Sequence, residues 1–295
     1  MKSYFWTKKQ IVPMKKILTT TSLIMFFGFV FPVCSLTELL FTKDAQANDL
    51  QQNPTTERGG LVQSNTLALT NPNPNIEQKV LDILKAMSDR LSGDQTMTFT
   101  AVTTYESPSR LGPALAYNTV SNVTLQRPNK LQIIVPGDGP ASEFYYNGKT
   151  MIAYAPEENL VAVADAPPTI DALLKFAYDN AAIYFPFSDV IVADPYKDIV
   201  DKLEIAFYIG QSKVIDGTKT DMFVIATNKV FAQVWIGSED KLPRMIRAVY
   251  SDDPLKLRHQ VTFSNWQLDV PIPAGTFASS RANDAKRIKF KHPNP

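Results

Sequence analysis

The sequence predicts an α+β protein built on one strongly curved antiparallel sheet, a half-barrel of about eleven strands with helices covering its concave face. Two observations indicate this fold class. Runs of alternating apolar and polar residues follow one another with short connections, which is typical of antiparallel neighbours. A single helical insert separates two such series of strands, and there is no strand-helix-strand alternation of the kind that builds a parallel sheet.

The first 47 residues have the pattern of an export signal. Lys8, Lys9, Lys15 and Lys16 form a positive region, and residues 17–36 then contain no charge. Ala45-Gln46-Ala47 supplies a small-x-small processing site, so we expect cleavage after Ala47 and a periplasmic location. A retained anchor is one alternative, because the apolar run approaches the roughly 20 residues that span a bilayer. A lipid-modified Cys34 is the other, although Phe31-Pro32-Val33 lacks the small residue that lipoprotein processing uses.

Cysteine and charge limit the possible functions further. Cys34 is the only cysteine and would leave with the leader. The mature chain would then contain neither a disulfide nor a thiol nucleophile. From Asn48 onward, 24 Lys and Arg stand against 27 Asp and Glu, a net charge of −3. This near balance provides no basic surface for nucleic acid.

Residues 48–75 are expected to form a disordered linker, because they are rich in Asn, Gln, Thr and Pro without sustained apolar periodicity. The folded domain is predicted over residues 76–280. It should open with a helix that begins at Ile76, is capped by Asn75 and ends at Gly93. The apolar residues that recur at helical spacing are Ile76, Val80, Ile83, Leu84, Met87 and Leu91.

From Thr96 the apolar period changes to two, which predicts a strand with one apolar face. That face contains Phe99, Ala101, Thr103 and Tyr105. The same pattern predicts the further strands of the first series at 117–125, 131–135, 142–146, 151–155 and 160–164. Asn147-Gly148 supplies the positive φ that a tight hairpin requires.

A helical insert then follows Pro167-Pro168, with Thr169 as its expected N-cap. Two shorter helical pieces are predicted at 187–193 and 195–203, since Pro195 suits a first helical turn. The second series of strands is expected at 205–214, 221–227, 231–236, 242–250 and 259–268. Residues 281–295 are predicted to be a basic, solvated tail rather than a contact with a membrane surface.

Seven short motifs occur in order over about residues 76–268. They are Arg127-Pro128-Asn129-Lys130-Leu131, Phe144-Tyr145-Tyr146-Asn147-Gly148-Lys149-Thr150, Thr169-Ile170-Asp171-Ala172-Leu173-Leu174, Ala193-Asp194-Pro195-Tyr196, Val214-Ile215-Asp216-Gly217, Val234-Trp235-Ile236 and Leu242-Pro243-Arg244. As a set they resemble the predicted periplasmic family designated domain of unknown function 2092. The resemblance implies the fold of the periplasmic lipoprotein carriers, in which helices plug a curved half-barrel around an apolar cavity. Typical members carry a Cys-His pair after the Val-Asp-Gly turn, where this chain has Asp221-Met222.

Groups that could carry out catalysis are scarce. The two histidines, His259 and His292, are too few for a histidine-based metal cluster, and no Cys-x-x-Cys motif occurs. A serine hydrolase would use a Gly-x-Ser-x-Gly elbow, which the sequence lacks. We therefore predict no catalytic residue, metal or cofactor, and an enzyme, a hydrolase for example, is the least favoured interpretation.

Aromatic side chains provide the remaining functional candidates. Phe144 and Tyr146 share one face of a predicted strand. With Leu173 and Phe176 of the insert, and with Trp235 and Phe263 of other strands, they are the predicted ligand-binding residues. Ordinary core packing would also explain them, and the carrier resemblance favours the lining of an apolar cavity.

The predicted function is that of an exported, non-enzymatic protein that sequesters a lipid, an acylated protein or another apolar ligand beneath its helical insert. Its contact with a membrane would be only transient. The alternative is an envelope protein-interaction or sensing module on the same scaffold, with a filled core and no ligand.

Overall fold

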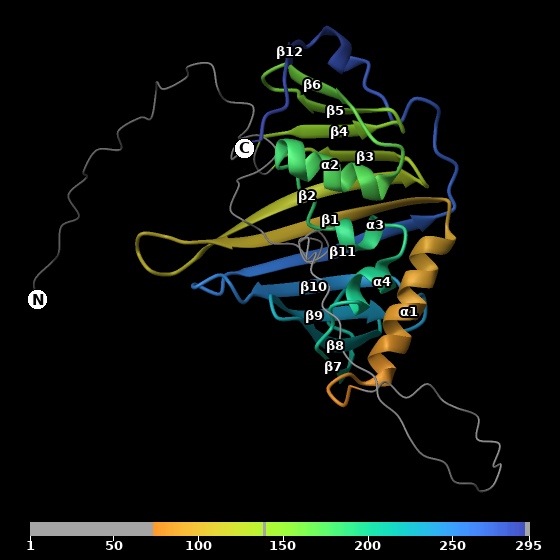
Figure 1. The fold of residues 1–295 in the computed structure, drawn as a ribbon, viewed down its shortest axis with the longest axis vertical. Helices are drawn as coiled ribbons and strands as arrows, with labels where there is room; N and C mark the ends of the chain where they lie inside the picture. The colour runs from red at the N-terminus through yellow and green to blue at the C-terminus, as the bar shows by residue number, and fades with distance from the viewer. Residues whose placement is uncertain (1–72, 138–139, 293–295) are drawn as a thin grey trace, which may run out of the picture.

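The computed structural model describes residues 73–137 and 140–292. They form one twelve-stranded sheet with the strand order β12-β6-β5-β4-β3-β2-β1-β11-β10-β9-β8-β7 (Figure 1). The strands are β1 (Thr96–Ser107), β2 (Leu115–Gln126), β3 (Lys130–Val135), β4 (Ser142–Tyr146), β5 (Thr150–Ala155), β6 (Leu160–Asp165), β7 (Ile205–Ser212), β8 (Thr220–Ala226), β9 (Val230–Gly237), β10 (Pro243–Tyr250), β11 (Arg258–Leu268) and β12 (Lys286–Ile288). The helices are α1 (Gln78–Gly93), α2 (Ile170–Ala181), α3 (Ser188–Ile191), α4 (Pro195–Val200) and the short 3-10 helix η2 (Arg281–Asp284).

The predicted fold class is confirmed. Each of the eleven strands expected from the sequence is present, with its ends within two residues of the expected bounds. Strands β1 to β6 form one antiparallel meander and β7 to β11 form a second. The meanders join through β1 and β11, which pair from Met97 opposite Leu268 to Tyr105 opposite His259.

The hairpin between β4 and β5 turns at Asn147-Gly148, as the sequence predicts. The Asn147 side chain accepts hydrogen bonds from the backbone N–H groups of Lys149 and Thr150 at 3.0 and 2.9 Å. Gly148 has a φ of +92°, and a Cβ atom there would lie 2.7 Å from Nδ2 of Asn129. Glycine therefore suits this turn, because another residue would be strained at this φ and its Cβ would displace the Asn129 side chain.

The helical insert crosses the concave face of the sheet. It leaves β6, which lies beside one edge of the sheet, and returns to β7 at the opposite edge. Figure 1 shows α2, α3 and α4 following one another across the strands. Thr169 caps α2 as predicted, since its side chain accepts a 3.3 Å hydrogen bond from Ala172 N.

The start of α1 differs from the prediction. Asn75 does not cap the helix, because Ile76 forms a parallel bridge with Ala206 of β7 and the helix begins only at Gln78. Glu77 N donates to Ala206 O at 2.8 Å, and Ala206 N donates to Asn75 O at 2.9 Å. Residues 75–77 pair with the edge of β7, since the edge of a sheet offers backbone donors and acceptors that have no strand partner. The helix ends at Gly93, as expected.

The main core lies between the concave face and the helices. Its largest fully buried side chains include Phe144, Tyr146, Phe187, Phe223 and Phe263. An irregularity in the pairing of β1 with β11 accompanies Asn265, whose φ is +56°. It places one extra residue between Phe263 and Trp266, so that both side chains lie in the same core.

The C-terminal residues form part of the fold, which corrects the expectation of a free basic tail from residue 281. Residues 281–284 form η2, and β12 pairs in parallel with β6. Ala282 and Ala285 pack against Tyr154 and Val161 on the convex face. The basic composition of this segment does not indicate such a role. Ile288 and Phe290, at alternate positions among lysines and arginines, pack against the main core.

Candidate functional site

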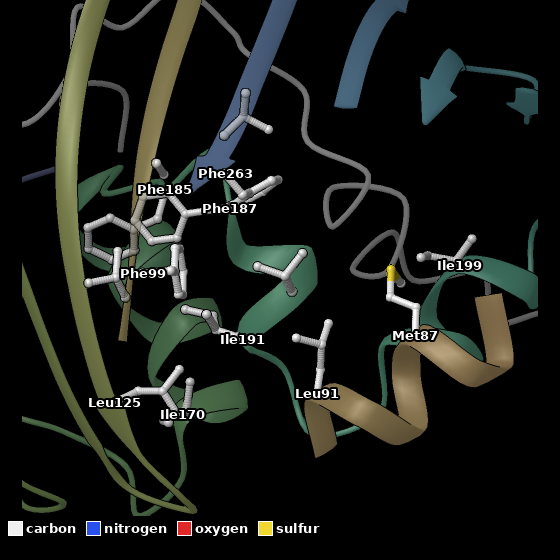
Figure 2. Close-up of a cluster of buried hydrophobic side chains, with 14 of the residues drawn as sticks. Met87, Leu91, Phe99, Leu125, Ile170, Phe185, Phe187, Ile191, Ile199 and Phe263 are labelled. Atoms are coloured by element: carbon white, nitrogen blue, oxygen red, sulfur yellow. The ribbon is translucent and has the colours of Figure 1, made fainter. Parts of the chain in front are cut away.

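A cluster of aromatic rings occupies the space between the concave face and the helical insert. The ring centroid of Phe99 lies 5.7 Å from that of Phe187 and 5.9 Å from that of Phe263. Phe185 continues the cluster, with its centroid 5.1 Å from that of Phe144 and 5.9 Å from that of Phe187. These are the separations at which aromatic pairs attract one another beyond simple burial. Figure 2 shows Phe99, Phe185, Phe187 and Phe263 gathered beside the helices.

Five of the six predicted ligand-binding residues belong to this core. Phe144, Tyr146, Leu173 and Phe263 are each no more than 1% exposed. Phe176 is half-buried and packs against the same residues from α2. The fold therefore brings together side chains from β4, β11 and the insert, as the sequence analysis expected.

Trp235 does not lie with them, which corrects the sixth prediction. Its neighbours in β9, Val234 and Ile236, belong to the concave core, whereas Trp235 does not. Side chains alternate across a strand, so Trp235 lies on the convex face, opposite Met222 and Met245. Val234, Trp235 and Ile236 are apolar at consecutive positions, so the alternation that indicates which face a strand residue occupies is missing here.

Sequence reasoning did not select Phe185 and Phe187 as ligand-binding residues. Both are buried, yet they lie in the segment between α2 and α3 rather than on an amphipathic element. Their signal was their spacing in Tyr184-Phe185-Pro186-Phe187, where two large apolar residues stand two positions apart in a connection. Connections are ordinarily polar and superficial, so such a pair indicates a segment that packs into the core.

Arg127 attaches the insert to the sheet. Its guanidinium donates hydrogen bonds of 3.1 Å to the backbone carbonyls of Leu91, Ile191 and Val192. Burial lowers the pKa of Arg127, while Asp171 and Asp94 favour its charged form. One side chain at the end of β2 therefore holds the C-terminal turn of α1 and the end of α3, which the fork geometry of arginine permits.

The N-terminus of α2 has its own attachments. Ile170 N donates to Pro128 O at 2.9 Å, and the Tyr146 hydroxyl donates to Pro167 O. Asp171 in the first turn accepts a 3.0 Å bond from Ala193 N, which joins α2 to the segment before α4. The cover is thus held to the sheet by polar contacts at its ends, with apolar packing between them.

A hollow of about 460 Å³ lies within the insert. The residues of α2 that line it are Asp171, Ala172, Leu174, Lys175 and Tyr178. They occupy the face of the helix other than the one that buries Leu173 and Ala177. Phe185, Ser188 and Asp198 line it from the following segments. Its volume lies within the roughly 300–1,000 Å³ of small-molecule pockets.

Carboxylates crowd this part of the insert. Burial, together with the negative charges of Asp171, Asp194 and Asp201, raises the pKa of Asp198 to about 6. Burial and the neighbouring Asp198 raise the pKa of Asp189 to about 7. Near neutral pH the carboxylates of neighbouring helices in the insert therefore repel one another.

Other chemical candidates are few in the part of the chain that the structure describes. No group of three His, Cys, Asp or Glu side chains there is arranged as metal ligands would be. His259 packs edge-on against Tyr250, and burial lowers its pKa. No helix among those residues has the length and apolar character to cross a bilayer.

Residues 81–291 match the model of a protein family described as "Predicted periplasmic protein (DUF2092)". The chain belongs to this family. The DUF2092 match includes β12 and extends beyond residue 280, which agrees with the structural role of the C-terminal residues. The periplasmic description also agrees with the location expected from the leader, which lies outside the described residues.

Solved structures similar to this DUF2092 protein include three from bacteria. A DUF1329 family protein from Desulfovibrio piger has 15% identity and a TM-score of 0.35, covering 70% of this chain and 98% of that chain. A LolA superfamily protein from Nitrosomonas europaea has 7% identity and a TM-score of 0.34, covering 68% and 97%. The Pseudomonas aeruginosa MucA/MucB complex has 12% identity and a TM-score of 0.37, covering 69% and 62%. No curated protein matches the chain.

The structure gives physical roles to several motifs that carried the DUF2092 resemblance. Arg127 and Pro128 anchor the insert, and Asn129 lies against Gly148 of the hairpin. Asp194 caps α4 by accepting a 3.0 Å bond from Lys197 N. Asp221, in the strand after the Val214–Gly217 motif, accepts hydrogen bonds from Tyr208 and Gln211 at 2.9 and 3.1 Å. Most of these motif residues therefore position the helical cover.

Proposed function

We propose that this periplasmic protein binds an apolar ligand, the acyl chain of a lipid or of an acylated protein, between its sheet and its helical insert. The observation that carries the proposal is the aromatic cluster that Phe99, Phe144 and Phe263 of the sheet form with Phe185 and Phe187 of the helical insert. The helical insert lies over the apolar concave face, and polar contacts hold it at its ends. This arrangement supports a site that opens and closes.

The binding needs no catalytic group. Each buried methylene contributes about 0.8 kcal/mol, so an acyl chain of ordinary length can be held by burial alone. In the free protein the aromatic rings occupy the concave face, and the chain would replace ring-ring contacts with ring-chain contacts of similar character. Arg127, Asp171 and Tyr146 would act as positioning residues for the cover, because they bind backbone atoms of the insert.

A second candidate is an envelope protein-interaction module that keeps its core filled. The specific observation in its favour is that Phe144, Phe187 and Phe263 are already almost completely buried by one another and by the helices. In that case the insert or the convex face would contact a protein partner, and no lipid would enter.

Binding of a fluorescent fatty-acid probe to delipidated protein tests the proposal. Phe176→Asp places a carboxylate on the core side of α2 and should abolish binding, since an unpaired charge in an apolar site is strongly disfavoured. Phe231→Asp makes the same change on the convex face, where Phe231 is 50% exposed, and should leave binding unchanged. Far-UV circular dichroism must show that both variants remain folded.

Mass spectrometry under native conditions, on protein purified from its own envelope fraction, gives an independent result. A co-purifying lipid supports the proposed function. Absence of probe binding to the delipidated wild type would rule out the acyl-chain site, and a bound protein partner would then support the interaction module.

A further inference from the structure

The hollow in the insert meets the concave core at Phe185. Phe185 lines the hollow, yet it is only 6% exposed. Its ring lies 5.1 Å from that of Phe144 and 5.9 Å from that of Phe187, both of which belong to the core. Phe185 therefore contacts the hollow and the aromatic cluster at the same time.

The segment that carries Phe185 is not part of a helix or a strand. Helix α2 ends at Ala181, and Ala182 has a left-handed φ of +50°. The chain then runs through Ile183 and Phe185 to Phe187, where α3 follows. Its backbone contacts with the flanking helices include bonds from Ile183 N to Ala177 O at 3.1 Å and from Ser188 N to Phe185 O at 3.0 Å. A ring on such a connection can change rotamer with less disruption than a ring on a sheet strand.

The lining of the hollow changes from charged to apolar with depth. Asp171, Lys175 and Asp198 are exposed or half-buried, whereas Ile183 and Phe185 are buried. An amphiphile must leave its polar end in water while its chain leaves water, because burying an unpaired polar group opposes binding. The hollow presents the two environments in that order.

We propose that this hollow is the entrance through which an acyl chain reaches the concave face, and that Phe185 is the side chain that closes it. The inference rests on the proposed function and adds a route and a closing residue to it. The chain would pass between α2 and the segment before α4, and the polar end of the amphiphile would remain at the charged rim.

The rate at which the fluorescent fatty-acid probe associates provides the first test. Phe185→Ala removes the ring between the hollow and the core and should raise the association rate several-fold. Phe187→Ala also removes a buried ring from the same cluster, but Phe187 does not line the hollow. It should therefore change affinity without a matching rise in association rate. Equal rates for the two variants would overturn the assignment of Phe185.

Blocking the hollow provides the second test. Ala172 lines the hollow on α2, and Ala116 is an exposed alanine on the projecting end of β2 (Figure 1). Ala172→Cys and Ala116→Cys are prepared in a chain whose only cysteine, Cys34, is replaced by serine, and each is labelled with a bulky maleimide. Labelling at position 172 should slow probe uptake strongly, and labelling at 116 should not.

The outcomes distinguish a failure of the proposed entrance from a failure of the proposed function. If the unlabelled proteins bind the probe and the label at position 172 has no greater effect than the label at 116, the hollow is not the entrance and the proposed function stands. If no unlabelled protein binds the probe, the proposed function fails and the entrance fails with it.

Discussion

Arg127 provides the clearest prediction at the scale of a single residue. Arg127→Lys keeps the positive charge but cannot reach the carbonyls of Leu91, Ile191 and Val192 together. We expect the free energy of unfolding to fall by about 2 kcal/mol, because charge-assisted hydrogen bonds to buried acceptors are lost. Urea denaturation measures the change.

The control is Arg287→Lys, since Arg287 is exposed on β12. It should alter stability by less than about 0.5 kcal/mol. If Arg127→Lys is equally harmless, the guanidinium does not hold the insert.

Asp189 makes stability depend on pH. Burial raises its pKa from the ordinary 3.8 to about 7. Between these values the folded chain retains a proton that the unfolded chain has lost, so the free energy of unfolding should increase as the pH falls from about 7 towards 4. Asp189→Asn removes the titration and should be more stable than wild type at pH 8, by on the order of 2 kcal/mol.

Thermal unfolding of the two proteins from pH 4.5 to pH 8 checks this. His259 acts in the opposite direction, because burial lowers its pKa and its protonation on acidification favours the unfolded chain. It is present in both proteins, so its contribution cancels in the difference between them. Parallel pH profiles for wild type and Asp189→Asn would contradict the prediction.

The site residues show what a sequence can indicate about individual side chains. Phe144, Tyr146 and Phe263 were predictable because strand alternation fixes a face and burial selects large apolar residues. Trp235 was grouped with them although it lies on the other face, because Val234-Trp235-Ile236 is apolar at consecutive positions and shows no alternation. Phe185 lies in a connection without periodicity, so its burial depends on tertiary packing that local patterns do not encode.

At the scale of elements, the hairpins were the most predictable feature. Their strands are adjacent in sequence, so turn chemistry such as Asn147-Gly148 and strand alternation are sufficient. Strand β12 was missed for the opposite reason. Its partner β6 ends at Asp165, more than a hundred residues earlier, and its own three residues include Lys286 and Arg287. No local signal connects the two segments.

Removing β12 should weaken the fold. A chain that ends at Ala285 loses Ile288 and Phe290, which pack against the core, and exposes the edge of β6. We expect a loss of about 2 kcal/mol from the lost apolar burial, and a greater tendency to aggregate through the exposed edge. A chain that ends at His292 keeps these contacts and serves as the control. Equal urea midpoints for both chains would show that β12 contributes nothing.

At the scale of the whole molecule, the predicted linker of residues 48–75 should contribute little to the stability of the folded domain. Asn73 and Asn75 do contact β7 and the residue before it, so the ordered part begins slightly earlier than predicted. A chain that starts at Asn73 should melt within a few degrees of one that starts at Asn48, because the preceding residues offer little periodic apolar surface. Differential scanning calorimetry measures both. A large difference would mean that Leu61, Val62, Leu67 or Leu69 packs on the domain.

The architecture of the whole molecule was predictable only in part. Local patterns predict two meanders and an insert, since these depend on neighbouring residues. They do not predict that the insert leaves the sheet beside one edge and returns at the other, which places its helices across the whole concave face. That arrangement depends on how the meanders join. They join through the pairing of β1 with β11, whose residues are far apart in the sequence.

The pairing of β1 with β11 also determines when an exported chain can finish folding. Secretion delivers the N-terminal end first, so β1 arrives and pairs with β2 while β11 is still to come. Until Leu268 emerges, one side of β1 offers unpaired backbone groups beneath an uncovered apolar face. Closure across this sequence distance is slow, because the entropy of ordering the intervening loop must be overcome first. The nascent protein is therefore most vulnerable to aggregation during passage into the periplasm, and assistance from envelope chaperones would have its greatest effect before β11 has arrived.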